Sequence, residues 1–211
     1  MSLTADNETL RTVHAEQELT NRQRVARGMT EVFSPAHLII LITVTTGAFA
    51  VPSIIAGIGW GLLAALFAGV IPYGIILIGV RRGNVGDKHI YHRSQRIKPL
   101  AFSVVAVVIG IALLALLGAP TAVIGVELSM LTGLALTLPI TMKWKISMHA
   151  AVAATVATSL VILYGPVWLL AFLPVAAIGW SRVVLRDHTI AQVIVGVPIG
   201  ILAALPLLLL V

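Results

Sequence analysis

The chain has 211 residues, of which 59% are hydrophobic and only 10% are charged. This composition excludes a soluble globular domain of ordinary make-up, in which about a quarter of the residues are charged. The formal net charge of +6 does not indicate nucleic-acid binding, because that requires a basic face exposed on a soluble domain. The partners expected for these cations are anionic lipid head groups or a phosphate-bearing ligand. The absence of cysteine excludes disulfides and thiolate catalysis.

Residues 1–35 are predicted to form a polar N-terminal segment ahead of one membrane-embedded domain at 36–211. Apolar residues recur in this segment at loosely helical intervals, at Leu10, Val13, Val25, Met29 and Val32. This spacing is typical of an amphipathic helix at a membrane surface, and a polar tail without regular structure is the alternative. Because the segment begins with acidic residues and has no early apolar run, it does not resemble a secretory signal, and we expect it to stay attached.

Seven apolar runs follow, each close to the roughly 20 residues that cross a hydrocarbon core of about 30 Å. They are 36–55, 58–80, 99–118, 121–141, 147–164, 167–185 and 189–210. Tight uncharged turns are expected at 57–59, 118–120 and 165–166, where glycine and proline gather. The sequence therefore predicts an all-α, polytopic transmembrane helix bundle of about six to seven spans.

The polar segments between these runs are 81–99, 143–149 and 181–192, and they follow the second, fourth and sixth spans. A chain that crosses a bilayer alternates sides, so all three segments are expected on the membrane face that also carries the N-terminal segment. All 14 Lys and Arg residues fall on that face. The positive-inside rule predicts that this face is cytoplasmic, most simply at the cell membrane.

Within the first polar segment, Lys88 and Arg96 are candidates for binding an anion. The planar guanidinium of arginine matches phosphate geometry, and lysine adds a point charge. Glu127 is the one carboxylate in the interior of a predicted span. An ionisable group at that depth is costly, and both a buried protonated group and a functional group remain open for it.

The second polar segment ends with His149 at a predicted helix start. Ser147 suits the N-cap position, and the amides beside Met148 lie at the positive end of the helix dipole, where an anionic oxygen is favoured. In the third segment, His188 and Gln192 are four residues apart and share a helix face. The amide oxygen of Gln192 can therefore accept from one imidazole nitrogen, which fixes the tautomer and leaves the other nitrogen to react.

These segments resemble the three motifs of the type 2 phosphatidic acid phosphatase superfamily, K-x6-R-P, P-S-G-H and S-R-x5-H-x3-D. Ser181-Arg182, five residues and then His188 match the third motif without a gap. Residues 147–149 match the second motif, with Met148 in place of glycine and isoleucine in place of proline at 146. Lys88, Arg96 and a proline at 99 approximate the first, with altered spacing.

The resemblance implies a metal-independent membrane lipid phosphatase that needs no cofactor. Its substrate would be a lipid phosphomonoester or diphosphate, such as a polyprenyl phosphate, phosphatidate or a lipid-linked sugar phosphate. His188 would attack phosphorus and form a phosphohistidine, while His149 protonates the leaving oxygen and later activates water. The groups expected to stabilise the phosphate oxygens are Lys88, Arg96, Ser147, Met148 and Arg182.

The main departure from the family pattern is Gln192, which stands where the third motif has aspartate. Glutamine can orient His188 but cannot stabilise an imidazolium by charge. Asp187 is expected to point elsewhere on the helix and to pair with Arg186. The alternatives are a catalytically impaired family member that binds phospholipid, and an anion transporter, which would need polar residues along a path through the span centres.

Overall fold

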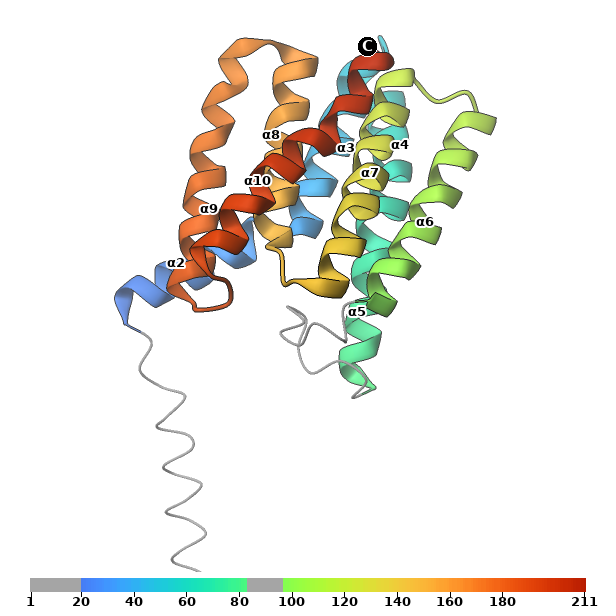
Figure 1. Ribbon diagram of the computed structural model, residues 1–211. Helices are drawn as coiled ribbons and strands as arrows, with labels where there is room; N and C mark the ends of the chain where they lie inside the picture. The colour runs from blue at the N-terminus through green and yellow to red at the C-terminus, as the bar shows by residue number, and fades with distance from the viewer. Residues whose placement is uncertain (1–19, 83–96) are drawn as a thin grey trace, which may run out of the picture.

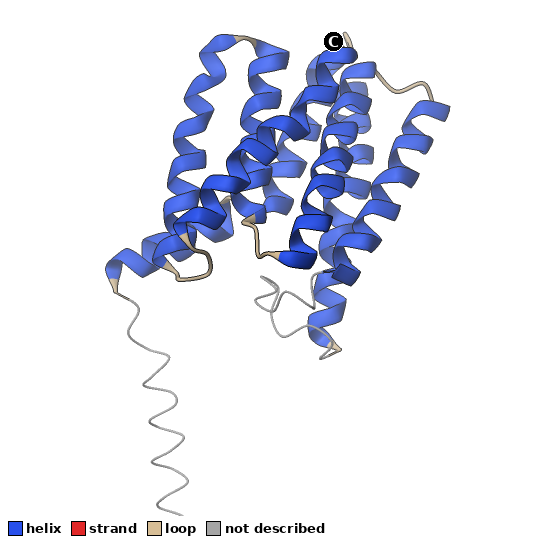
Figure 2. Cartoon of the chain, in the orientation of Figure 1, coloured by secondary structure: helices blue, strands red, loops and turns tan. Residues whose placement is uncertain are grey.

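The computed structural model describes residues 20–82 and 97–211, and within these ranges the chain is helical with short connecting turns and no strand (Figures 1 and 2). The all-α class predicted from the sequence is confirmed. The elements are α2 (Asn21–Val32), α3 (Pro35–Ala50), α4 (Ile54–Ala65), η1 (Leu66–Val70), α5 (Ile71–Arg81), α6 (Ile97–Leu116), α7 (Thr121–Lys143), α8 (Met148–Tyr164), η3 (Pro166–Ala171), α9 (Phe172–Val184), α10 (Ile190–Ala204) and η4 (Leu205–Leu209).

The chain is an integral membrane protein with a polytopic helical bundle. In the described part of the chain, five helical segments are long and apolar enough to cross a membrane, and the α2–α3 pair, bent by 43°, counts as a sixth only when both helices are taken as one span. The fifth predicted run, 147–164, corresponds to α8, whose 17 residues reach only about 26 Å. Nine of those residues are buried, so α8 lies in the centre of the bundle between α3, α7, α9 and α10.

The first predicted turn, at 57–59, is misplaced. The chain turns earlier, at residues 51–53, where Pro52 interrupts the helix and Ser53 caps α4 by accepting from the amide of Ala56. Gly57 lies inside α4 instead, and a Cβ there would collide with the backbone of Gly47 in α3. Glycines in this stretch therefore allow two helices to approach closely rather than forming a turn. The turns at 118–120 and 165–166 lie where they were expected.

Close packing of α8 on α10 also depends on glycine. A Cβ at Gly196 would lie 2.9 Å from the carbonyl oxygen of Ser147, and one at Gly200 would collide with the carbonyl oxygen of Ala151. The hydroxyl of Thr155 uses this proximity and donates to the carbonyl of Gly200 at 3.0 Å. The start of α8 is thereby held against the start of α10.

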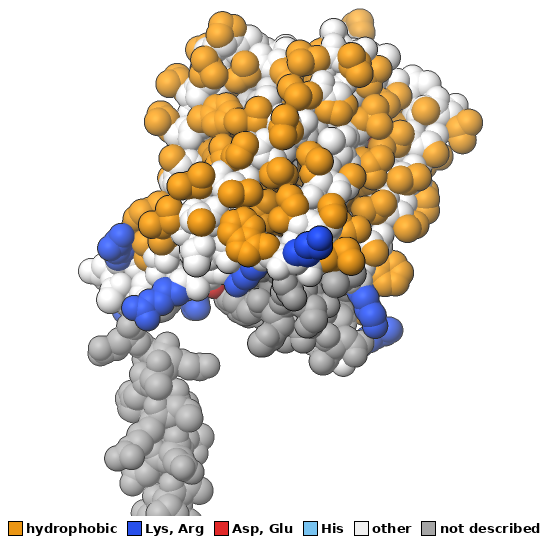
Figure 3. Space-filling model, viewed as in Figure 1, with side chains coloured by type: hydrophobic (Ala, Val, Ile, Leu, Met, Phe, Trp, Pro, Cys, Tyr) orange, Lys and Arg blue, Asp and Glu red, His pale blue; other side chains and the backbone are white. Residues whose placement is uncertain are grey.

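The polar parts of the fold gather at one end of the bundle. Figure 1 places α2, the 144–147 connection and the 185–189 connection at the end opposite the C-terminus. In Figure 3 the Lys and Arg side chains on the visible face collect at that same end, and hydrophobic side chains cover the remainder. This distribution agrees with the predicted polar site at one membrane face.

Candidate active site

A tight turn after α9 brings the two ends of the third motif together. Arg186 has a left-handed backbone (φ 57°). Its amide donates to the carbonyl of Val183 at 3.0 Å, and the amide of Asp187 donates to the carbonyl of Arg182 at 3.0 Å. This is the hydrogen-bond pattern of a Schellman C-cap, which satisfies the last carbonyls of a helix. The amide of His188 also donates to the carbonyl of Arg182, at 3.2 Å. The turn therefore fixes His188 beside the residue that begins the motif.

The tautomer of His188 follows from its hydrogen bonds. Its Nδ1 atom lies 3.1 Å from Oε1 of Gln192, and the same oxygen accepts from the amide of Thr189 at 3.2 Å. A carbonyl oxygen only accepts, so Nδ1 carries the proton and Nε2 keeps its lone pair. Thr189 and Gln192 also form a capping box at the start of α10. The expected contact between His188 and Gln192 is therefore present.

His149 is held at the first turn of α8. Ser147 caps this helix with its hydroxyl, which accepts from the amide of Ala150 at 3.4 Å. Its own amide donates to the carbonyl of Gln192 at 3.2 Å, which ties the start of α8 to the start of α10. Ser147 is fully buried, whereas His149 is 7% exposed and lines an internal cavity together with Met148.

Arg182 is buried at 2% exposure and is held by contacts on both terminal nitrogens. Its Nη2 atom lies 2.9 Å from Oδ2 of Asp187, and Nη1 donates to the hydroxyl of Thr30 at 3.3 Å. Asp187 therefore forms its ion pair with Arg182 and not with Arg186, because the Schellman turn folds it back over the end of α9.

His188 lies between two hollows of the protein. On one side is a polar depression whose lining includes Lys145, where the ammonium donates to the carbonyl of Asp187 at 2.6 Å. The residues that line this depression are Lys145, Val183, Arg186, Asp187, His188, Thr189 and Gln192. On the other side is a cavity of about 210 Å³ inside the bundle. The imidazole of His188 can therefore face a charged group of a ligand on the side of the depression and an apolar group on the side of the cavity.

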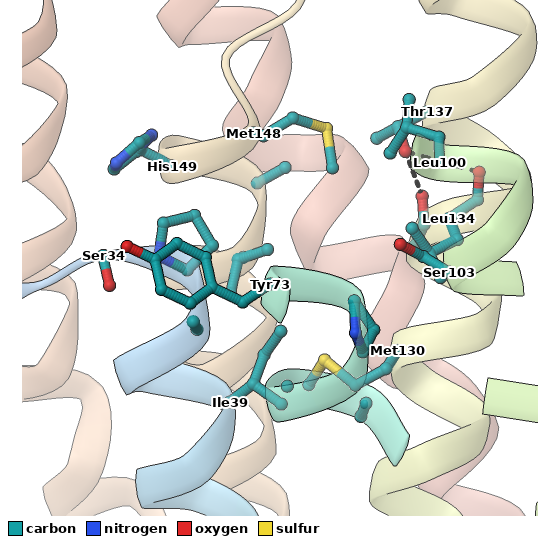
Figure 4. Close-up of a pocket in the computed structure, with 18 of the residues that line it drawn as sticks. Ser34, Ile39, Tyr73, Leu100, Ser103, Met130, Leu134, Thr137, Met148 and His149 are labelled. Atoms are coloured by element: carbon teal, nitrogen blue, oxygen red, sulfur yellow. Dashed lines mark hydrogen bonds between the residues drawn. The ribbon is translucent and has the colours of Figure 1, made fainter. Parts of the chain in front are cut away.

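The cavity has a polar end and apolar walls. His149, Arg182 and His188 lie at the polar end, and the walls come from α3, η1, α5, α6, α7 and α8. Along α8 it extends from His149 to Thr155, six residues or about 9 Å of helix. Figure 4 shows Tyr73 reaching from α5 toward Ser34 at the start of α3, with Met130 and Leu134 of α7 on the far wall.

The predicted site residues fall into three groups. Arg182, His149, Met148 and His188 line the cavity together. Gln192 borders the polar depression and Ser147 is a buried helix cap, so both hold other site residues in place. Lys88 and Arg96 lie outside the described residues.

Sequence reasoning missed three contributors from the N-terminal half. Thr30 contacts Arg182 across 152 positions of sequence, while Glu31 and Tyr73 line the cavity. Only one signal could have indicated Thr30, namely its spacing of four from Ala26, which places both on the buried face of α2. Nothing in the sequence near Tyr73 distinguishes it from an ordinary interfacial aromatic residue.

The fold and the site together define a polytopic membrane protein with a histidine and arginine centre beside an apolar cavity. Residues 132–211 match the family model described as the PAP2 superfamily. This match confirms the resemblance to the type 2 phosphatidic acid phosphatase superfamily for the part of the chain that holds His149, Arg182 and His188. No curated protein and no solved structure matches the chain.

Proposed function

We propose that this protein is a membrane lipid phosphatase that hydrolyses the phosphomonoester or diphosphate of a bilayer lipid through a phosphohistidine. The observation that carries the proposal is the convergence of His149, Arg182 and His188 at the polar end of one apolar-walled cavity. A lipid phosphate has the matching chemistry, with an anionic group joined to a hydrocarbon tail. The family match over 132–211 supports a phosphatase.

In the proposed mechanism, Nε2 of His188 attacks phosphorus in line with the departing lipid oxygen. The proton on Nδ1 stays hydrogen-bonded to Gln192, so the imidazole is oriented for attack. His149 donates a proton to the lipid oxygen as the P–O bond breaks, and then takes one from the water that attacks the phosphohistidine. The products are the lipid alcohol, or the lipid monophosphate from a diphosphate, and inorganic phosphate.

Negative charge on the phosphoryl oxygens is stabilised by Arg182 in this scheme. A guanidinium in a water-poor site interacts strongly with an anion because the local dielectric constant is low. Lys88 and Arg96 are proposed to supply further positive charge, as their motif positions suggest. The basic end of the bundle is proposed to face the cytoplasm.

Phosphate release by purified protein tests the proposal. Detergent-solubilised protein is incubated with a panel of lipid mono- and diphosphates in the presence of a chelator, and wild type is compared with His188→Ala. We expect chelator-resistant release that the substitution abolishes, and a phosphoprotein that survives alkaline quench in wild type alone. Ser129→Ala is the matched control and should stay active, because the Ser129 hydroxyl donates to the carbonyl of Gly125 in its own helix.

A second candidate function is lipid binding without turnover, and the neutral Gln192 beside His188 favours it. An aspartate at that place would stabilise the imidazolium formed during attack, and glutamine does not. Absence of release from every lipid, together with binding of inorganic phosphate that Arg182→Gln removes, would select this second function.

A further inference from the structure

The N-terminal helix α2 reaches the candidate active site through one buried hydroxyl. Thr30 is 2% exposed and its hydroxyl oxygen accepts from Nη1 of Arg182 at 3.3 Å. It also lies 3.1 Å from the hydroxyl of Ser181, which donates onward to the carbonyl of Ile178 at 2.7 Å. Because the proton of Ser181 is used there, Thr30 donates to Ser181. A directed chain therefore runs from Arg182 through Thr30 and Ser181 to the backbone of α9.

A second, more exposed side of α2 has the composition of a membrane-surface helix. Val25 and Val32 are 58% and 64% exposed, and with the half-buried Met29 they follow the i, i+4, i+7 spacing of one helix face. Arg22 and Arg24 flank that apolar face. Apolar residues bordered by arginine suit a helix whose apolar side enters the acyl region while its cations remain among head groups.

The position of α2 in the fold agrees with this reading. The helix lies at the basic end of the bundle (Figures 1 and 3). It is bent by 43° from α3, the apolar helix that follows it. The guanidinium of Arg22 lies 5.6 Å from the ring centre of Trp180, and tryptophan at a helix end is typical of the lipid head-group region.

We propose that α2 binds the anionic lipid surface and that this contact sets the position of Arg182 through Thr30. The positive charges of Arg22, Arg24 and Arg27, all exposed, fit anionic phospholipid head groups and not zwitterionic ones. When the surface holds α2 on α9, Thr30 and Asp187 orient the guanidinium from two sides. Anionic lipid then raises the affinity of the site for phosphate. The inference rests on the proposed function only in taking Arg182 as a phosphate-binding residue.

The sign of the lipid effect distinguishes this proposal from simple electrostatics. A negative membrane surface repels inorganic phosphate from the solution next to it, so surface potential alone weakens phosphate binding in anionic bilayers. The proposed coupling strengthens it. Thr30 is a positioning residue in this scheme, because it acts through Arg182.

The test uses the full chain in nanodiscs of phosphatidylcholine, with and without phosphatidylglycerol. Amide hydrogen exchange over residues 21–32 reports the surface contact, and calorimetric titration with inorganic phosphate reports the site without requiring turnover. We expect slower exchange in α2 and severalfold tighter phosphate binding in the anionic discs. The triple substitution Arg22→Gln, Arg24→Gln and Arg27→Gln should remove both differences, whereas Arg81→Gln with Arg82→Gln, two exposed cations elsewhere, should keep them.

The coupling itself is tested by a matched pair at one position. Thr30→Val keeps the shape of the side chain and removes the hydroxyl, and Thr30→Ser keeps the hydroxyl. Valine should abolish the lipid effect on phosphate binding while α2 still gains protection, and serine should retain both. Equal exchange in the two lipids, or an unchanged lipid effect in Thr30→Val, would overturn the proposal. If no lipid is hydrolysed but these binding results appear, the proposed function fails and the lipid coupling stands.

Discussion

The carboxylate of Asp187 lies 2.9 Å from Nη2 of Arg182, so the acid next to the proposed nucleophile is paired with the proposed phosphate-binding arginine. Both side chains are nearly buried, at 2% exposure for the arginine and 10% for the aspartate. In the absence of a substrate anion, Asp187 supplies the negative charge that a buried guanidinium needs. A bound phosphate would share this role.

Asp187→Asn should therefore lower the stability of the ligand-free protein. Removing one member of a buried ion pair leaves the other uncompensated, at a cost of about 3 kcal/mol. Inorganic phosphate should restore much of that loss by binding to Arg182, so its stabilising effect is expected to be larger in the variant than in wild type. Thermal unfolding with and without phosphate measures both quantities. An equal shift by phosphate in the two proteins would contradict this account of the pair.

Gln192→Glu should accelerate turnover. Glutamate has the length of glutamine and can keep the contacts to His188 and Thr189, while adding a negative charge beside the imidazole. A charge-assisted hydrogen bond is stronger than a neutral one by about 1 kcal/mol, which corresponds to a gain of roughly fivefold to tenfold in kcat. Gln192→Met, which removes the acceptor, should reduce kcat below wild type. No gain with glutamate would mean that another group already supplies the charge.

Arg186→Gly should stabilise the protein. Its backbone is left-handed, a conformation that costs a residue with a side chain about 1 kcal/mol and costs glycine little. Arg186→Ala is the control, since it removes the guanidinium but keeps the strain. Unfolding temperatures should rank glycine above wild type and alanine. If alanine behaves like glycine, the effect comes from the side chain and not from the backbone.

Gly200→Ala should push α10 away from α8 and reduce both stability and activity. The added methyl collides with the carbonyl of Ala151, and overpacking of this kind costs about 1–3 kcal/mol. Because α8 carries His149 and the connection that leads into α10 carries His188, turnover should fall as well. Gly59→Ala in α4 meets nothing within 4 Å and should be neutral or slightly stabilising. Matched melting curves and rates for the two variants make the comparison.

Glu127→Met should raise the unfolding temperature. Glu127 is fully buried in α7, and neither carboxylate oxygen has a hydrogen-bond partner in the described part of the chain. A buried polar group in that state costs about 1–3 kcal/mol, which methionine of similar volume avoids. Thermal unfolding in detergent measures the change. A less stable variant would show that Glu127 has a partner or ligand that stabilises the fold.

The bundle and the histidine pair could be predicted because they depend on local patterns. Apolar runs of span length indicated the helices, and a spacing of four placed Gln192 beside His188. The misplaced turn at 57–59 has a different cause, since glycine serves both turns and close helix contacts. Only the packing of Gly57 against Gly47 decides between these roles, and packing partners far apart in sequence leave no local signal.

The contacts of Arg182 show the same limit in the site. Its motif was evident, but its partners were not, because Asp187 reaches it only through the left-handed turn at Arg186. Arginine is an unusual residue for that conformation, so its residue type did not indicate the left-handed turn. Eight described elements separate Thr30 in α2 from Arg182 in α9, and no spacing rule covers such a distance.

The order in which the site is completed has a consequence for biogenesis. Thr30 and His149 precede α9 in the chain, whereas Arg182 lies in α9, His188 in the connection after it and Gln192 in α10. During synthesis the earlier helices therefore enter the bilayer with an incomplete centre. His188 comes to share a cavity with His149 only when α10 packs on α8 through Gly196 and Gly200. A nascent chain is thus inert toward the lipids around it until its last helix pair has been inserted.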